Sequence, residues 1–191
     1  MSWPCARVTA RENLVWSLAS VAVAASLLVP APRAGEAPAD VVLSGHAVAG
    51  VGLGQPEGST LHRLEKLLGR PTRRLAPTPV LENCGVDATT SWRSLIVYFF
   101  DERLVGAALG PGGVPRGETA QGLRPGDTLA RARAIYGRRL STSTVQDGVW
   151  RVRTNSGRID GFLLVHGPRP NNRSQIATID IGVVGCPALS P

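Results

Sequence analysis

The fold is decided by residues 58–70, Gly58-Ser59-Thr60-Leu61-His62-Arg63-Leu64-Glu65-Lys66-Leu67-Leu68-Gly69-Arg70, which recur in altered form at residues 126–138. Six of the thirteen aligned positions are identical. The second copy reads Gly126-Asp127-Thr128-Leu129-Ala130-Arg131-Ala132-Arg133-Ala134-Ile135-Tyr136-Gly137-Arg138. This agreement predicts that one structural unit occurs twice in the chain.

Both copies have the pattern of a short helix. Apolar residues recur at helical spacing in each. Ser59 and Asp127 are the candidate N-terminal caps, because their side-chain oxygens can accept from the first free N–H groups. Gly69 and Gly137 stand where a left-handed residue ends a helix. We therefore predict one helix in each copy, bounded by these residues.

The domain plan follows from the repeat. We predict a first α/β unit at residues 40–109, a Gly/Pro-rich linker at 110–122 and a second unit at 123–191, all within one compact domain. Each unit is expected to be a short helix packed on a small antiparallel sheet. The predicted fold class is therefore α+β with two tandem units.

Residues 1–39 have the organisation of an export signal. A basic start is followed by the uncharged, apolar residues 14–29 and then by an Ala-Pro-Ala sequence that suits a signal peptidase. Cleavage after Ala34 and retention of the apolar segment as an anchor are the alternatives. We expect cleavage before Asp40, which gives a secreted or periplasmic chain without a stable membrane anchor.

The charge of the chain limits the classes of partner. The 191 residues contain 21 Lys and Arg against 14 Asp and Glu, a formal net charge of +7. The arginines are scattered, whereas a nucleic-acid-binding protein carries a dense basic stripe. We therefore expect no nucleic-acid partner. Weak attraction to anionic envelope polymers is the alternative to an ordinary solvated basic surface.

Residues 91–100 have the pattern of the best strand in the chain, rich in aromatic and β-branched side chains. If they form one strand, Trp92, Tyr98 and Phe100 share a face with Ile96. Both faces are apolar, so the strand is either covered on both sides or offers one side to a partner. Trp92, Arg93, Tyr98 and Phe100 are our candidate protein-binding face. Packing of these aromatics in the core is the alternative.

The surrounding segments complete the predicted sheets. Asp101 and Glu102 are expected to turn the chain into a hairpin partner at residues 103–109, and residues 158–164 echo that partner in the second half. Trp150 is predicted to point inward. A polar outer face is predicted for the second half from Arg151, Arg153, Thr178 and Asp180.

The repeat resembles that of the beta-lactamase inhibitory protein family and of the related small lipoproteins of the outer-membrane β-barrel assembly machinery. The unit in those proteins opens with glycine and a hydroxyl or acidic residue and closes with Gly-x-Pro, here Gly58 through Pro71. The resemblance implies a helix followed by antiparallel strands, carried twice in the inhibitors. The second copy has Arg139 in place of the proline, and each half has one cysteine where the inhibitors have disulfides within each half. No inhibitory residue is carried over, because the target-contacting loop has no counterpart.

No catalytic or metal motif accompanies the repeat. His46, His62 and His166 lack the spacing of metal ligands. A nucleophile elbow and a phosphate-binding loop are also missing from the sequence. We therefore predict a secreted, non-enzymatic protein that binds an unidentified protein partner and needs no cofactor.

The alternatives are a secreted hydrolase assembled from scattered residues and an inhibitor of an envelope enzyme. A hydrolase would bring His46 or His166 together with a carboxylate and a hydroxyl in a pocket. A binding protein would instead present a shallow face of its sheet.

The mature chain retains a pair of cysteines, Cys84 and Cys186, while Cys5 belongs to the export signal. An even pair in an oxidising compartment predicts a disulfide. A catalytic thiol would need a neighbouring base, and no histidine is near either cysteine in sequence. We predict a Cys84–Cys186 disulfide that links the two halves.

This disulfide makes the two cysteines equivalent in a stability measurement. Cys84→Ser and Cys186→Ser should lower the free energy of unfolding by similar amounts, up to about 4.7 kcal/mol for a closed loop of roughly a hundred residues. The reason is that either change removes the same bond. Peptide mapping under non-reducing conditions should join the two peptides. Two clearly unequal losses, or a free thiol in exported protein, would contradict the pairing.

Overall fold

The structure is a computed structural model that describes residues 40–76, 85–113, 116–143 and 148–182. All of these belong to one unit of the chain, residues 37–191. The predicted export signal and both cysteines of the predicted disulfide, Cys84 and Cys186, lie outside the described residues. Those two predictions therefore stay predictions.

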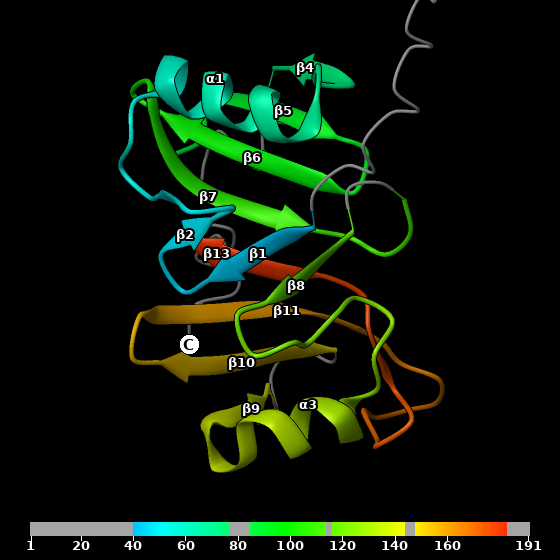
Figure 1. The fold of residues 1–191 in the computed structure, drawn as a ribbon. Coiled ribbons are helices and arrows are strands. Elements are labelled where there is room, and N and C mark those ends of the chain that lie inside the picture. The colour runs from blue at the N-terminus through cyan, green and yellow to red at the C-terminus, as the bar shows by residue number, and fades with distance from the viewer. Residues whose placement is uncertain (1–39, 77–84, 114–115, 144–147, 183–191) are drawn as a thin grey trace, which may run out of the picture. The chain divides into compact units, whose positions relative to one another are not determined.

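The described chain is α+β, as predicted, and strand residues outnumber helical ones (Figure 1). The helical elements are α1 (Glu57–Leu68), α3 (Leu129–Tyr136) and the 3₁₀ turn η1 (Gly137–Arg139). The strands before α3 are β1 (Val41–Ser44), β2 (Ala47–Val48), β3 (Val51–Gly52), β4 (Arg73–Leu75), β5 (Ala88–Trp92), β6 (Leu95–Phe100), β7 (Arg103–Leu109) and β8 (Gly117–Thr119). Those after it are β9 (Leu140–Thr142), β10 (Val149–Thr154), β11 (Gly157–Leu164), β12 (Gln175–Ile176) and β13 (Ile179–Gly182).

Most strands form one large antiparallel sheet in the order β4-β5-β6-β7-β13-β11-β10-β9, with β12 paired to β11. The strands of the first half occupy one side of this sheet and those of the second half the other. They meet where β7 pairs antiparallel with β13, in the register Leu109↔Ile179 and Ala107↔Ile181. A second, smaller sheet has the order β3-β2-β1-β8.

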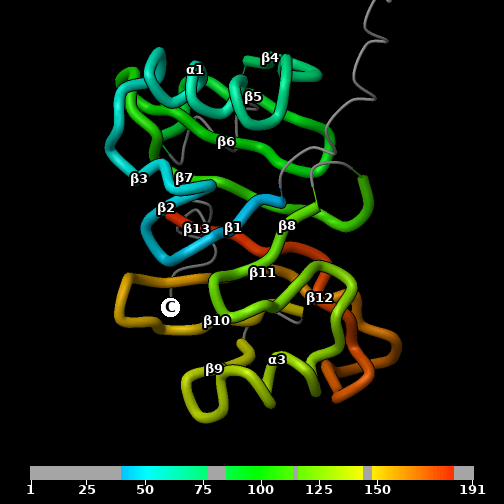
Figure 2. The backbone as a smooth tube through the Cα atoms, viewed as in Figure 1, coloured from blue at the N-terminus to red at the C-terminus, as the bar shows by residue number. Residues whose placement is uncertain are grey.

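One face of the large sheet carries the hydrophobic core. Trp150, Val152, Ile159 and Ile181 point into it, and the cluster continues through Leu64 of α1, Leu129 of α3 and Leu43 of β1. The two helices and the small sheet therefore cover this same face. Figures 1 and 2 show them in the order α1, small sheet, α3, which runs across the strands from the β5–β6 side to the β10–β9 side. We call the opposite face of the large sheet the distal face.

Both helices form where the repeat predicts them, but their caps differ from the prediction. α1 begins after Pro56, and the Ser59 hydroxyl donates to the Pro56 carbonyl oxygen instead of capping an N–H. In α3 the cap is Thr128, whose hydroxyl accepts from the Arg131 N–H at 3.2 Å. Asp127 instead accepts from the Arg124 N–H, so it closes the turn before the helix.

The C-terminal ends of the helices agree with the prediction. Gly69 and Gly137 follow the last helical residues with φ of 78° and 56°, values that suit glycine. No helix among the described residues combines the length and the apolar character that a membrane crossing requires.

The predicted single strand at residues 91–100 is wrong, because the chain turns inside it. Arg93 and Ser94 form a two-residue connection between β5 and β6, with Arg93 at φ 52°, and Trp92 pairs with Leu95. A turn restarts the alternation of side chains. Trp92 therefore lies on the core face, 2% exposed, where its Nε1–H donates to the Gly69 carbonyl oxygen at 2.8 Å.

Two neighbouring connections have opposite outcomes. The predicted turn at Asp101 and Glu102 is confirmed. Both residues have positive φ, 50° and 55°, as the two central residues of a two-residue hairpin turn require. Residues 110–122, predicted as a linker, contain β8, which pairs in parallel with β1. The composition could not indicate this strand, because its partner is distant in sequence.

The position of Trp92 predicts a large effect on stability. Trp92→Ala should lower the free energy of unfolding by about 3–5 kcal/mol, since it leaves a cavity in the core and removes a hydrogen bond to the end of α1. Phe100→Ala is the matched control, because Phe100 is 50% exposed and should cost about 1 kcal/mol or less. Chemical denaturation measures both. Equal small losses would show that Trp92 is not a core residue.

Candidate functional site

The distal face is organised by a row of residues that are cross-strand partners through the whole large sheet. The register pairs each with the next: Arg73, Ser91, Ile96, Ala108, Asp180, Asp160, Arg151 and Ser141. Two carboxylates therefore stand side by side at the centre of this row, on β13 and β11. Both are buried, at 3% and 8% exposure respectively.

Asp160 is fully engaged by cations. Arg151 Nε donates to its Oδ1 at 2.8 Å, and Arg158 Nε lies 2.7 Å from its Oδ2. The guanidinium groups offset the cost of burying this charge. Asp160 is thus a structural ion-pair centre of the distal face.

Asp180 has no such compensation. Its Oδ2 accepts from the Thr178 hydroxyl at 3.1 Å, and no ion pair to it occurs among the described residues. Burial raises the pKa of the Asp180 carboxyl to about 7; the Thr178 hydrogen bond opposes this rise and the neighbouring Asp160 charge adds to it. At neutral pH the group is therefore close to the midpoint of its titration.

Tyr98 of β6 faces the same carboxyl. Burial raises the pKa of the Tyr98 hydroxyl to about 12, and the negative charge of Asp180 adds to the rise. The phenol therefore stays protonated and can donate or accept a hydrogen bond at this place.

A cavity of about 340 Å³ opens above these groups. Its walls include the rings of Tyr98 and Phe162 and the aliphatic groups of Ile96 and Ala108. The polar lining comes from Arg93, Ser94, Thr178 and Asp180. Phe162 remains 41% exposed. The arrangement is a partly apolar hollow with one desolvated carboxylic acid.

The predicted binding residues are only partly brought together. Tyr98 and Arg93 line this cavity, and Phe100 lies further along β6, half exposed at its end. Trp92 is on the opposite face, because the turn at Arg93 reverses its direction. The prediction of Trp92 as a surface anchor is therefore wrong.

The predicted polar outer face of the second half is placed correctly but is less exposed than expected. Asp180 and Arg151 both belong to the distal row, yet Asp180 is buried. Asp160 was not among the predicted site residues. The available indication was an aspartate between apolar residues in each of two strands, Ile159-Asp160-Gly161 and Ile179-Asp180-Ile181.

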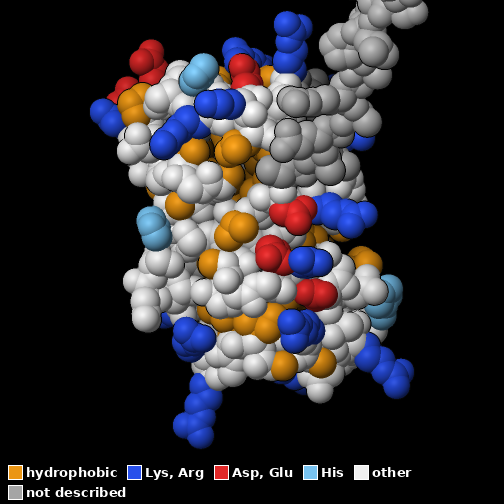
Figure 3. Space-filling view, in the orientation of Figure 1, with side chains coloured by type: hydrophobic (Ala, Val, Ile, Leu, Met, Phe, Trp, Pro, Cys, Tyr) orange, Lys and Arg blue, Asp and Glu red, His pale blue; other side chains and the backbone are white. Residues whose placement is uncertain are grey.

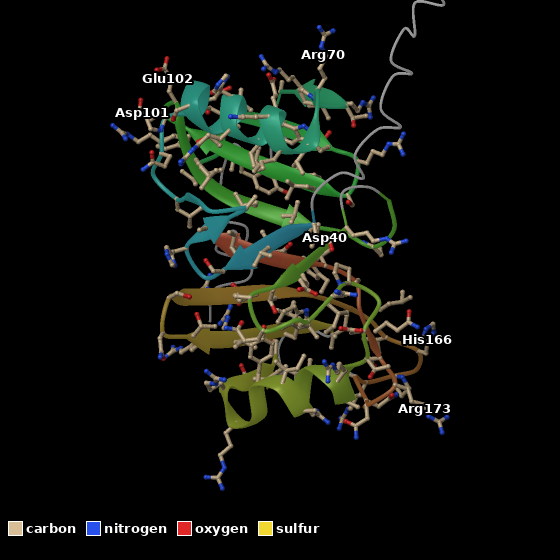
Figure 4. All side chains as sticks on the ribbon, in the orientation of Figure 1. Asp40, Arg70, Asp101, Glu102, His166 and Arg173 are labelled. Carbon is tan, nitrogen blue, oxygen red and sulfur yellow. The ribbon has the colours of Figure 1, made fainter. Side chains whose placement is uncertain are left out.

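The histidines do not assemble a catalytic group among the described residues. All three are exposed, and His46 Nδ1 donates to the backbone oxygen of Ser156 at 3.0 Å. Figure 4 shows His166 pointing away from the sheet, at the other end of the structure from Asp101 and Glu102. The same residues contain no cluster of three or more side chains that could hold a metal ion.

The helix-bearing side of the structure has a different character. Lys and Arg side chains are dispersed over it (Figure 3). Arg124 there pairs with Glu118 at 2.7 Å, both partly exposed. Such exposed pairs contribute little to stability, and no cavity with an aromatic lining accompanies them among the described residues.

Comparison with known proteins gives one structural likeness. No family model matches the chain, and no curated protein matches it. The crystal structure of the uncharacterized protein yfeY from Escherichia coli is similar to it with a TM-score of 0.48 and 9% sequence identity. The alignment covers 75% of this chain and 99% of that chain. A likeness of this degree identifies neither a family nor a function.

The raised pKa of Asp180 predicts how stability depends on pH. The folded protein holds this proton up to about pH 7, whereas the unfolded chain releases it near 3.8. The contribution of Asp180 to the free energy of unfolding is therefore complete below the unfolded pKa. It is lost as pH rises from there through about 7. Asp180→Asn carries no charge and should escape this loss, on the order of 2 kcal/mol.

Denaturation curves at pH 5 and pH 8 measure the difference. Asp101→Asn is the matched control, since Asp101 is exposed in a turn that asparagine accepts, and it should follow the wild type. Equal pH dependence in the Asp180→Asn variant and the wild type would contradict a desolvated carboxyl.

Proposed function

We propose that this chain is an exported, non-enzymatic binding protein and that the distal face of its large sheet contacts a protein partner. The observation that carries the proposal is that this face exposes large apolar side chains on both sides of the row that runs through Asp180. Leu75, Phe100, Phe162 and Leu164 are each 41–51% exposed. They point away from the core because they alternate with buried residues or pair with residues of the distal face.

The composition of the face supports binding. Aromatic and arginine side chains dominate the energetics of protein interfaces. Phe100 and Phe162 present rings, and Arg93 presents a guanidinium beside the cavity. The antiparallel strands of the large sheet provide the extended surface that a protein partner needs.

Catalysis is supported less well. Asp180 has the pKa that a general acid or base needs, but it is 3% exposed and its neighbour Asp160 is engaged by two arginines. The hydroxyl groups of Thr178 and Tyr98 face it, but none of the described histidines lines its cavity. The hydrolase expected from His46 or His166 therefore lacks its histidine at this carboxyl.

Export and duplication remain parts of the proposal. Export rests on the sequence of residues 1–39. Duplication is supported by the strand order. Each helix is followed by a series of four strands, β4-β5-β6-β7 after α1 and β9-β10-β11-β13 after α3, and the last strands of the two series, β7 and β13, pair with each other. The echo between residues 103–109 and 158–164 counts against it, because these are β7 and β11, which hold different places in the two series. The resemblance to the beta-lactamase inhibitory proteins keeps an envelope enzyme among the candidate partners.

Affinity capture from the native envelope with matched variants tests the proposed surface. Phe162→Ala and Phe100→Ala should lose the captured partner while the melting temperature falls by no more than about 4 °C, because both side chains are exposed on the distal face. Leu67→Ala is the control: Leu67 is 45% exposed on α1, which covers the other face. Loss of the partner with Leu67→Ala alone would place the interface on the helical side and overturn the proposal.

A further inference from the structure

We propose that the cavity beside Asp180 receives a primary ammonium group, the side chain of a lysine on the partner protein. The inference rests on the proposed function, since it specifies what the distal face recognises. It goes further by naming the chemical group and the residue that takes it.

Two adjacent aspartates of the distal face differ in their cation partners. Asp160 and Asp180 are cross-strand partners and similarly buried. Asp160 has a cation on each oxygen, whereas Asp180 has a hydroxyl donor and no ion pair among the described residues. A buried carboxylate is costly unless it is paired. The missing cation is therefore one that a ligand can supply.

The Asp180 carboxylate has one oxygen already occupied. Oδ2 is occupied by the Thr178 hydroxyl, and no donor to the other oxygen occurs among the described residues. A guanidinium uses a rigid fork that suits two oxygens, whereas an ammonium is a compact donor that needs only one. One remaining oxygen is enough for the compact ammonium group of lysine, whereas it cannot be bound by both arms of a guanidinium fork.

The lining of the cavity suits a lysine side chain. A lysine side chain combines an aliphatic stem with a charged head, and it packs the stem on apolar surface. Ile96 and Ala108 offer that surface, and the rings of Tyr98 and Phe162 can face the cation. The volume of about 340 Å³ leaves room for a side chain of this kind.

The charged groups around Asp180 do not prevent an ammonium group from binding it. Arg151 and Arg158 are held by Asp160, and Tyr98 is uncharged at neutral pH. Arg93 lines the cavity but is exposed, so solvent and salt screen its repulsion. An ammonium group favours the ionised carboxyl, and its affinity must rise as pH increases through about 7, where Asp180 loses its proton.

Calorimetric titration of the purified full chain with n-butylammonium chloride tests the ammonium site. At pH 8 the wild type should bind it at least about tenfold more tightly than Asp180→Asn, the loss expected for one hydrogen bond to a charged group. Asp101→Asn should bind as the wild type does. The wild type should also prefer n-butylammonium to n-butylguanidinium and to 1-butanol.

Two results would overturn the site. One is equal binding of n-butylammonium by the wild type and Asp180→Asn. The other is a wild-type affinity for n-butylammonium that weakens by less than about tenfold from pH 8 to pH 5. This second result needs no variant, so it can be obtained even if Asp180→Asn does not fold.

A second arm separates the lysine from the proposed function. Envelope extract acetylated on its lysines should no longer yield the partner captured from untreated extract. Capture that survives acetylation while still depending on Phe162 would overturn the lysine and leave the binding face standing. Capture that is independent of Phe162 and Phe100 would overturn the binding face itself, whatever n-butylammonium does.

Discussion

The pairing of β7 with β13 is the interaction on which the rest of the structure depends. Its register, Leu109↔Ile179 through Gly106↔Gly182, joins the strands of the two halves into one sheet. Without it each half would end in an unpaired strand edge, a row of unsatisfied backbone groups. The close approach requires glycine: a Cβ on Gly182, at φ +76°, would lie 2.1 Å from the Val105 carbonyl oxygen. The joint between the halves therefore tolerates no side chain at this position.

The same pairing creates the chemistry of the distal face. Because side chains alternate, Ile179 and Ile181 enter the core and Asp180 points to the opposite side, between Ala108 and Asp160. Two carboxylates thereby become neighbours although they come from separate strands, and the arginines of the second half satisfy only Asp160. A carboxyl held at a free-energy cost beside a partly apolar cavity is the arrangement in which perturbed groups mark functional sites. The proposed ammonium site is the direct consequence of this unequal compensation.

The sequence was sufficient for the local elements and insufficient for their pairing. Helical spacing with Gly69 and Gly137 predicted both helices, and Asp101-Glu102 between apolar runs predicted the β6–β7 hairpin. The turn at Arg93-Ser94 was missed because neither residue is typical of a left-handed position, and this error placed Trp92 on the wrong face. The site itself could not be predicted, since the contact of Asp160 with Asp180 depends on strands that meet only in the folded sheet. The aspartates within the apolar strands indicated burial, but nothing in the sequence indicated which strands would be neighbours.

Cross-strand nuclear Overhauser effects between the backbone protons of β7 and β13 test the central claim most directly. The account predicts such effects for the pairs Leu109 with Ile179 and Ala107 with Ile181, and a matching series from Asp180 of β13 to Asp160 of β11. Backbone contacts from β13 to β11 but to no residue of β7 would contradict it. The two halves would then be separate sheets, and the distal face would not exist as one surface.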